Sequence, residues 1–227
     1  MLKRLAIWFS VIVTGFLLFA ATQIPFQMGL FGGYSGVGLT LIGVLQAVLI
    51  LPLLYVGLRL LGMDFRSIGW AAAHWQKDVL LGAVAALVWA LLQFLWIIPQ
   101  TGGAERQDVA EIIAMLGGQW ANVWWYLPLG IIGGGLVEEF YNRGFFIGAF
   151  AGIFKDSKLA LYGAAVLSIV FFAAGHLPRN WVEWIDLLIP SVLYTVLYLY
   201  TGRLTASIVA HALWNTTVAI LVMILYT

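Results

Sequence analysis

LVEEFYNR, residues 136–143, places two carboxylates and a guanidinium inside a stretch that otherwise has the composition of a membrane span. A charged side chain at the centre of a bilayer costs at least about 2.5–3.5 kcal/mol on insertion scales. Glu138, Glu139 and Arg143 are therefore candidate functional residues. The apolar sequence on either side of them decides the fold.

The chain as a whole has the composition of a membrane protein. Of its 227 residues, 63% are hydrophobic and 9% are charged, and the mean hydropathy is +1.00, whereas soluble domains carry roughly 25% charged residues. We therefore predict an all-α, polytopic membrane bundle of about seven to eight transmembrane helices. The apolar runs of spanning length are residues 5–22, 37–61, 79–98, 124–153, 159–176, 184–201 and 204–226.

Charge and residue usage exclude several functions. A net charge of +1 provides no basic surface for nucleic acid, so membrane lipid is the expected surrounding and nucleic acid is not an expected partner. The chain has no cysteine, which excludes a disulfide framework, a thiolate zinc site and a cysteine nucleophile.

The connecting segments carry interfacial signals. Residues 99–122 are the most polar stretch, and Ile112, Ile113 and Leu116 are spaced for one face of a short amphipathic helix, which would lie on the membrane or cap a cavity. Several tryptophans fall at predicted span ends, where an aromatic belt is expected. They are Trp120, Trp124, Trp125, Trp181 and Trp184.

The cations indicate an orientation. With a cytoplasmic N-terminus and strict alternation of seven spans, only Arg106 and Arg179 fall outside, and Arg143 belongs to the buried motif. The other eight of the eleven Lys and Arg residues fall on the cytoplasmic side, at positions 3, 4, 59, 66, 77, 155, 158 and 203.

The first motif separates its two acids. On a helix, Glu139 and Arg143 share a face because they are four residues apart, whereas Glu138 and Glu139 project about 100° apart. We predict an ion pair between Glu139 and Arg143, and a Glu138 that is free to face a cavity as a base. The preceding glycines, residues 133–135, would let another helix or a substrate backbone come close. This motif alone leaves a structural ion pair or a transporter's coupling site open.

Two further polar motifs lie in later spans. FAAGH, residues 172–176, closes the fifth span, and HALWN, residues 211–215, lies inside the last. His211 and Asn215 share a helical face and both offer hydrogen-bond donors. The third histidine, His74, lies in a charged connector and is expected to be interfacial.

The order EExxxR, FxxxH and HxxxN resembles the CPBP family, which contains the type II CAAX prenyl proteases and their bacteriocin-processing, Abi-like relatives. The resemblance covers roughly residues 124–220 and divides the chain into an N-terminal part without a matched motif, residues 1–123, and a catalytic core, residues 124–227. The matching positions are Glu138, Glu139, Arg143, Phe172, His176, His211 and Asn215.

This resemblance implies an intramembrane endopeptidase that cleaves a hydrophobic or prenylated membrane-associated peptide, in a bacterial or archaeal plasma membrane. Glu138, helped by His176, would activate water, and His211 and Asn215 would donate hydrogen bonds to the oxyanion. Glu139, Arg143 and Phe172 would support them.

That mechanism requires no metal. A zinc ion held by Glu138, His176 and His211 stays open as an alternative, although the sequence lacks an HExxH helix.

Other functions and one topological conflict stay open. A non-catalytic scaffold, such as a kinase regulator or a bacteriocin-immunity protein, would use the same core as structure. An ion-coupled transporter is disfavoured because no inverted repeat is visible.

Strict alternation of the spans places Glu138 and His176 toward the outer side of the membrane, whereas the resemblance implies an active site that works from the cytoplasmic side. A re-entrant segment at residues 99–122 or an extra crossing would change this parity.

Overall fold

The computed structural model describes residues 1–227, which are helical with no strands, so the all-α polytopic bundle is confirmed. Six helical runs are long and apolar enough to cross a membrane. They are α1 (Leu2–Gln27), α2 (Val37–Leu60), α3 (Trp75–Leu92) continued by η3 (Gln93–Ile97) and α4 (Ile98–Gln100), α8 (Lys158–Gly175), α9 (Trp181–Thr201) and α10 (Thr205–Tyr226). Short helices occupy the connections: η1 (Leu30–Gly32), η2 (Arg66–Ile68), η4 (Gly103–Glu105) and α5 (Gln107–Leu116).

The predicted span at residues 124–153 is one uninterrupted helical run from residue 120 to residue 153. We call this run the motif helix. It begins as α6 (Trp120–Pro128), continues as the π-helical segments η5 (Leu129–Glu138) and η6 (Phe140–Ala149), and ends as α7 (Phe150–Ile153). The wider winding starts directly after Pro128, which has no N–H to donate. π-Helical turns are rare and are found frequently at functional sites.

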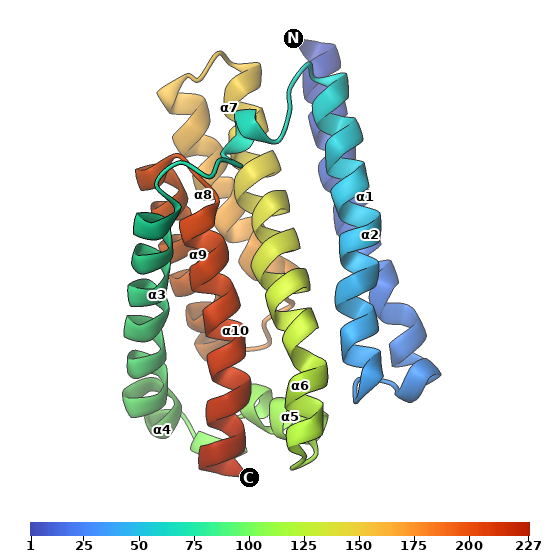
Figure 1. Cartoon of the computed structure of the whole chain (residues 1–227), viewed down its shortest axis with the longest axis vertical. Coiled ribbons are helices and arrows are strands. Elements are labelled where there is room, and N and C mark those ends of the chain that lie inside the picture. The colour runs from blue at the N-terminus through green and yellow to red at the C-terminus, as the bar shows by residue number, and fades with distance from the viewer.

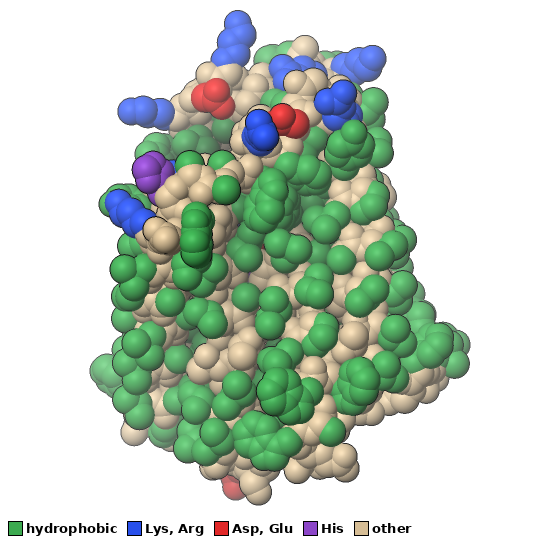
Figure 2. Space-filling view, viewed as in Figure 1, with side chains coloured by type: hydrophobic (Ala, Val, Ile, Leu, Met, Phe, Trp, Pro, Cys, Tyr) green, Lys and Arg blue, Asp and Glu red, His purple; other side chains and the backbone are tan.

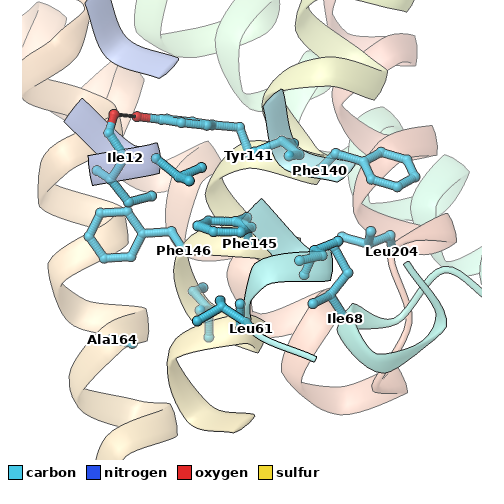
Figure 3. Packing of buried hydrophobic residues seen from close by; sticks show 14 of the residues in the cluster. Ile12, Leu61, Ile68, Phe140, Tyr141, Phe145, Phe146, Ala164 and Leu204 are labelled. Atoms are coloured by element: carbon cyan, nitrogen blue, oxygen red, sulfur yellow. Dashed lines mark hydrogen bonds between the residues drawn. The ribbon is translucent and has the colours of Figure 1, made fainter. Parts of the chain in front are cut away.

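The motif helix passes through the middle of the bundle (Figure 1). It packs against α2 and α10 through η5, and against α1, α2 and α8 through η6. Aromatic side chains of η6 form the centre of the largest apolar cluster, and the Tyr141 hydroxyl donates a hydrogen bond to the Ile12 carbonyl of α1 (Figure 3). The charged motif is therefore held by an element that is packed from several sides.

The two ends of the bundle differ in charge. The N- and C-termini lie at opposite ends of the molecule (Figure 1), as an odd number of crossings requires. Lys and Arg side chains gather at the end that holds the N-terminus (Figure 2). At that end, Arg203 forms an ion pair with Asp78, with 2.6 Å between Nε and Oδ2.

The amphipathic helix expected within residues 99–122 is α5, and its apolar face is covered by α10. Val109 packs in one cluster with Val222, and Leu116 packs with Ala219 and Met223. A helix of ten residues is too short to cross a bilayer. The α5 helix therefore caps the end of the bundle away from the N-terminus and adds no crossing.

Ion pairs fix this cap to α9. Arg106 Nη2 lies 2.5 Å from Asp186 Oδ2, and Arg179 Nη1 lies 2.5 Å from Glu111 Oε1. Hydrogen bonds to Glu111 and Glu183 raise the pKa of the Arg179 guanidinium above its ordinary value. Both arginines at this end thus have acidic partners.

Candidate active site

The ion pair expected between Glu139 and Arg143 is present and fully buried. Arg143 Nη1 lies 2.9 Å from Glu139 Oε1, and both side chains have 0% exposure. Arg143 Nη2 also donates to the carbonyl and hydroxyl oxygens of Ser191 on α9, at 3.1 and 2.8 Å. A buried charge without a partner would be strongly destabilising, so this pair ties the motif helix to α9.

His211 reaches from α10 to the same carboxylate. Its Nδ1 lies 2.9 Å from Glu139 Oε1, and its ring stacks on Tyr194 with 4.7 Å between centroids. The opposite nitrogen, Nε2, lies 4.0 Å from Glu138 Oε2. The imidazole thus lies between the two glutamates. With Nδ1 donating to Glu139, Nε2 accepts a hydrogen bond in the neutral ring and donates one only when the ring is protonated.

Glu138 has a different environment from its neighbour. Its side chain is 19% exposed, whereas that of Glu139 is fully buried. It borders a cavity of about 510 Å³, and its Oε2 atom has no hydrogen-bond partner. Glu138 therefore faces a cavity, as the angular separation of the two acids predicts.

His176 borders the same cavity from the end of α8. Its Nδ1 lies 2.8 Å from the Phe172 carbonyl oxygen. Because a carbonyl can only accept, Nδ1 carries the proton, and in the neutral ring Nε2 is free to accept one. The backbone of the FxxxH motif thus sets the tautomer of its own histidine.

The Phe172 ring connects the three motifs. Its centroid lies 4.5 Å from the His176 ring and 5.8 Å from the His211 ring. The Arg143 guanidinium carbon lies 4.7 Å from the same centroid, a cation–π distance. Phe172 therefore spaces the two histidines and covers the buried ion pair.

Asn215 shares the α10 face with His211, but its Nδ2 donates to the Gly130 carbonyl at 2.9 Å. Neither Asn215 nor His211 borders the cavity. Glycines of the motif helix make this contact possible: a Cβ on Gly134 would lie 2.3 Å from Asn215 Nδ2, and one on Gly135 would lie 2.6 Å from the Ala212 Cβ. The close helix approach expected at residues 133–135 is thus present, and Asn215 fixes α10 to the motif helix.

The alternative zinc ligands do not form a metal cluster in this arrangement. The chain contains no group of three or more acidic, histidine or cysteine side chains spaced to hold a metal ion. The His211 Nδ1 is directed at Glu139, so only its Nε2, which lies 4.0 Å from Glu138 Oε2, faces Glu138.

Two cavity residues were missed by the sequence reasoning. Gln46 of α2 is 3% exposed, and its Oε1 has no partner. Asn142 is 4% exposed, donates from Nδ2 to the Glu138 carbonyl at 3.0 Å, and leaves its Oδ1 without a partner. A usable signal existed for Gln46, because an amide in the middle of an apolar span is costly unless it has a partner or lines a cavity.

Comparison with known proteins agrees with this geometry. Residues 120–217 match the family model described as type II CAAX prenyl endopeptidase, Rce1-like. This range contains all three motifs and the whole of α8 and α9. No curated protein and no solved structure gave a significant match. The resemblance indicated by the three motifs is thus confirmed by a match over residues 120–217, which contain a region similar to the Rce1-like type II CAAX prenyl endopeptidases.

Proposed function

We propose that this chain hydrolyses a peptide bond of a membrane-associated substrate, and that Glu138 and His176 activate the attacking water. The family match over residues 120–217 supports an intramembrane protease in general. One observation carries the finer assignment: Glu138, with an unpartnered Oε2, and His176, with a free Nε2, border the same cavity of about 510 Å³.

In the proposed reaction, a water in the cavity loses a proton to Glu138 or His176 while its oxygen attacks the scissile carbonyl carbon. The carbonyl electron pair moves onto oxygen and forms a tetrahedral oxyanion. The same pair of residues then returns the proton to the leaving amine nitrogen as the C–N bond breaks, giving a carboxylate and an amine.

In the buried cluster of Glu138, Glu139, Arg143 and His211, we propose His211 as an oxyanion donor through Nε2, which lies 4.0 Å from Glu138 Oε2. When Glu138 takes the proton from water, the cluster gains one positive charge, and the oxyanion balances it. Asn215, which does not border the cavity, would hold α10 against the motif helix through its hydrogen bond to the Gly130 carbonyl.

The wall of the cavity supports an apolar substrate. Aromatic side chains of α1 and α8 border it, namely Phe16, Phe19, Phe171 and Phe172. We propose a hydrophobic or prenylated peptide, with hydrolysis independent of an added metal.

The test is hydrolysis of fluorogenic peptides, prenylated and unprenylated, by the protein purified and reconstituted in lipid. Replacing Glu138 by Ala should lower kcat by about 10²-fold or more, as expected for loss of a general base. The control is Glu105→Ala, because Glu105 is an exposed acid distant in sequence from the motifs. Equal rates for wild type and Glu138→Ala would contradict the proposal, and a wild type inactive on every peptide would favour a non-catalytic scaffold.

A further inference from the structure

The cavity opens at one end of the bundle, and this end carries few Lys and Arg residues. Besides Glu138 and His176, its border includes Gln23 and Gln27 from the last turns of α1, Tyr34 from the following turn, and Leu177 just after α8. Leu177 is 78% exposed, and Tyr34 donates a hydrogen bond to Gln23 Oε1 at 3.0 Å. No residue of the connections at the N-terminal end borders the cavity.

The charges of the two ends are strongly asymmetric. The N-terminal end holds eight Lys and Arg residues and three Asp residues, whereas the opposite end holds two Arg residues and five acidic residues. Both arginines of the opposite end, Arg106 and Arg179, form ion pairs with acidic side chains. Lys and Arg in short loops are enriched on the cytoplasmic side of membrane proteins. This rule places the N-terminal end in the cytoplasm.

The number of membrane crossings places the mouth of the cavity at the end opposite to the N-terminus. The termini lie at opposite ends of the bundle (Figure 1), and α5 packs on α10 without crossing. The segment at residues 99–122 therefore does not change the parity. The mouth formed by the end of α1 and the end of α8 lies on the side opposite to the cytoplasmic cations.

We propose that the site takes its substrate from the extracytoplasmic side, as an apolar peptide segment that lies in the outer leaflet and reaches Glu138 between α1 and α8. This inference rests on the proposed function and reverses the cytoplasmic side that the family resemblance implies. The polar groups at the mouth are uncharged, being the side chains of Gln23, Gln27 and Tyr34. They suit the backbone and neutral side chains of a peptide rather than a charged headgroup.

The absence of cysteine makes the orientation directly measurable. Single cysteines are introduced at the mouth, Gln27→Cys and Leu177→Cys, and at the cation-rich end, Ser157→Cys, all at exposed positions or in exposed turns. Intact cells are treated with a membrane-impermeant maleimide. The two mouth cysteines should be labelled at once, and Ser157→Cys only after permeabilisation. The reverse pattern, or labelling of all three from outside, would overturn the proposal.

A second measurement tests whether substrate enters through this mouth, and it does not depend on how the protein is oriented in cells. A bulky maleimide on Gln27→Cys should suppress hydrolysis by the reconstituted protein, whereas the same label on Ser157→Cys should leave the rate unchanged. Equal rates would contradict access through this mouth. If the unlabelled protein fails to hydrolyse any peptide, the proposed function fails while the labelling pattern in cells still decides the orientation of the cavity.

Discussion

The two faces of the motif helix hold the two adjacent glutamates in opposite environments. On the sealed face, Glu139 is fully buried between Arg143 and His211. On the open face, Glu138 borders the cavity with an unpartnered oxygen. Neighbouring carboxylates with the same chemistry thus receive different roles from the elements that face them. We expect the sealed face to control stability and the open face to control the reaction.

Breaking the sealed face should have the largest effect. Replacing Arg143 by Met leaves the Glu139 carboxylate buried without its cation, which should destabilise the protein by about 3–5 kcal/mol. Thermal unfolding in detergent measures this. Arg179→Met is the matched control, because that arginine is 40% exposed and solvent screens its ion pairs. Equal melting temperatures for the two variants would show that the buried pair has no special role.

On the open face, His176→Ala should lower kcat by about 10²-fold while leaving the melting temperature unchanged, because the ring serves proton transfer and lies at the border of the cavity. His74→Ala is the control, since His74 is exposed in a connector and should keep full activity. Loss of stability without loss of rate per folded molecule would assign His176 to structure instead.

Disturbing the contact between the motif helix and α10 at Gly134 should have an intermediate effect on stability. A Cβ at Gly134 would meet Asn215 Nδ2 at 2.3 Å, so Gly134→Ala should destabilise the protein by about 1–3 kcal/mol through overpacking. At Gly163 of α8 no atom lies within 4 Å of a new Cβ, so Gly163→Ala should be neutral or slightly stabilising. Similar unfolding of both variants would contradict a close approach of α10.

The smallest effect is expected at Gln46 of α2, which borders the same cavity as Glu138 and lies outside the matched region. Gln46→Leu removes a hydrogen-bonding group without filling or emptying the cavity greatly, so KM should rise by up to about tenfold with kcat nearly unchanged. Thr40→Val, on the same helix and bonded to the Trp125 carbonyl, is the control. A fall in kcat with constant KM would place Gln46 in the chemical step rather than in substrate binding.

The sequence predicted the ion pair of the sealed face, but it did not predict the long-range contacts of the site, and the reason is physical. The pair of Glu139 and Arg143 is local, because a spacing of four residues fixes it on one helix. The spans are visible because apolar length is a property of the sequence alone. The bond between His211 and Glu139 depends on how α10 is rotated toward the motif helix, which no local spacing encodes. Gln46 and the packing of α5 on α10 are likewise long-range contacts.

The spans themselves extend beyond their apolar centres. The first was predicted at residues 5–22, whereas α1 covers Leu2–Gln27, because helical hydrogen bonding continues through the polar residues at both ends. The π-helical winding of η5 and η6 also carried no sequence prediction. It starts after Pro128 and includes three consecutive glycines, which together give a local signal.

The most direct test compares isosteric changes at the two adjacent acids, Glu138→Gln and Glu139→Gln, by measuring peptide hydrolysis and thermal unfolding on the same reconstituted samples. Glu138→Gln should keep the melting temperature of the wild type and lose hydrolysis by about 10²-fold or more. Glu139→Gln should lower the melting temperature because Arg143 loses its charged partner. A Glu138→Gln variant that hydrolyses peptides at the wild-type rate, or two variants that lose stability equally, would contradict the division of roles between the two faces.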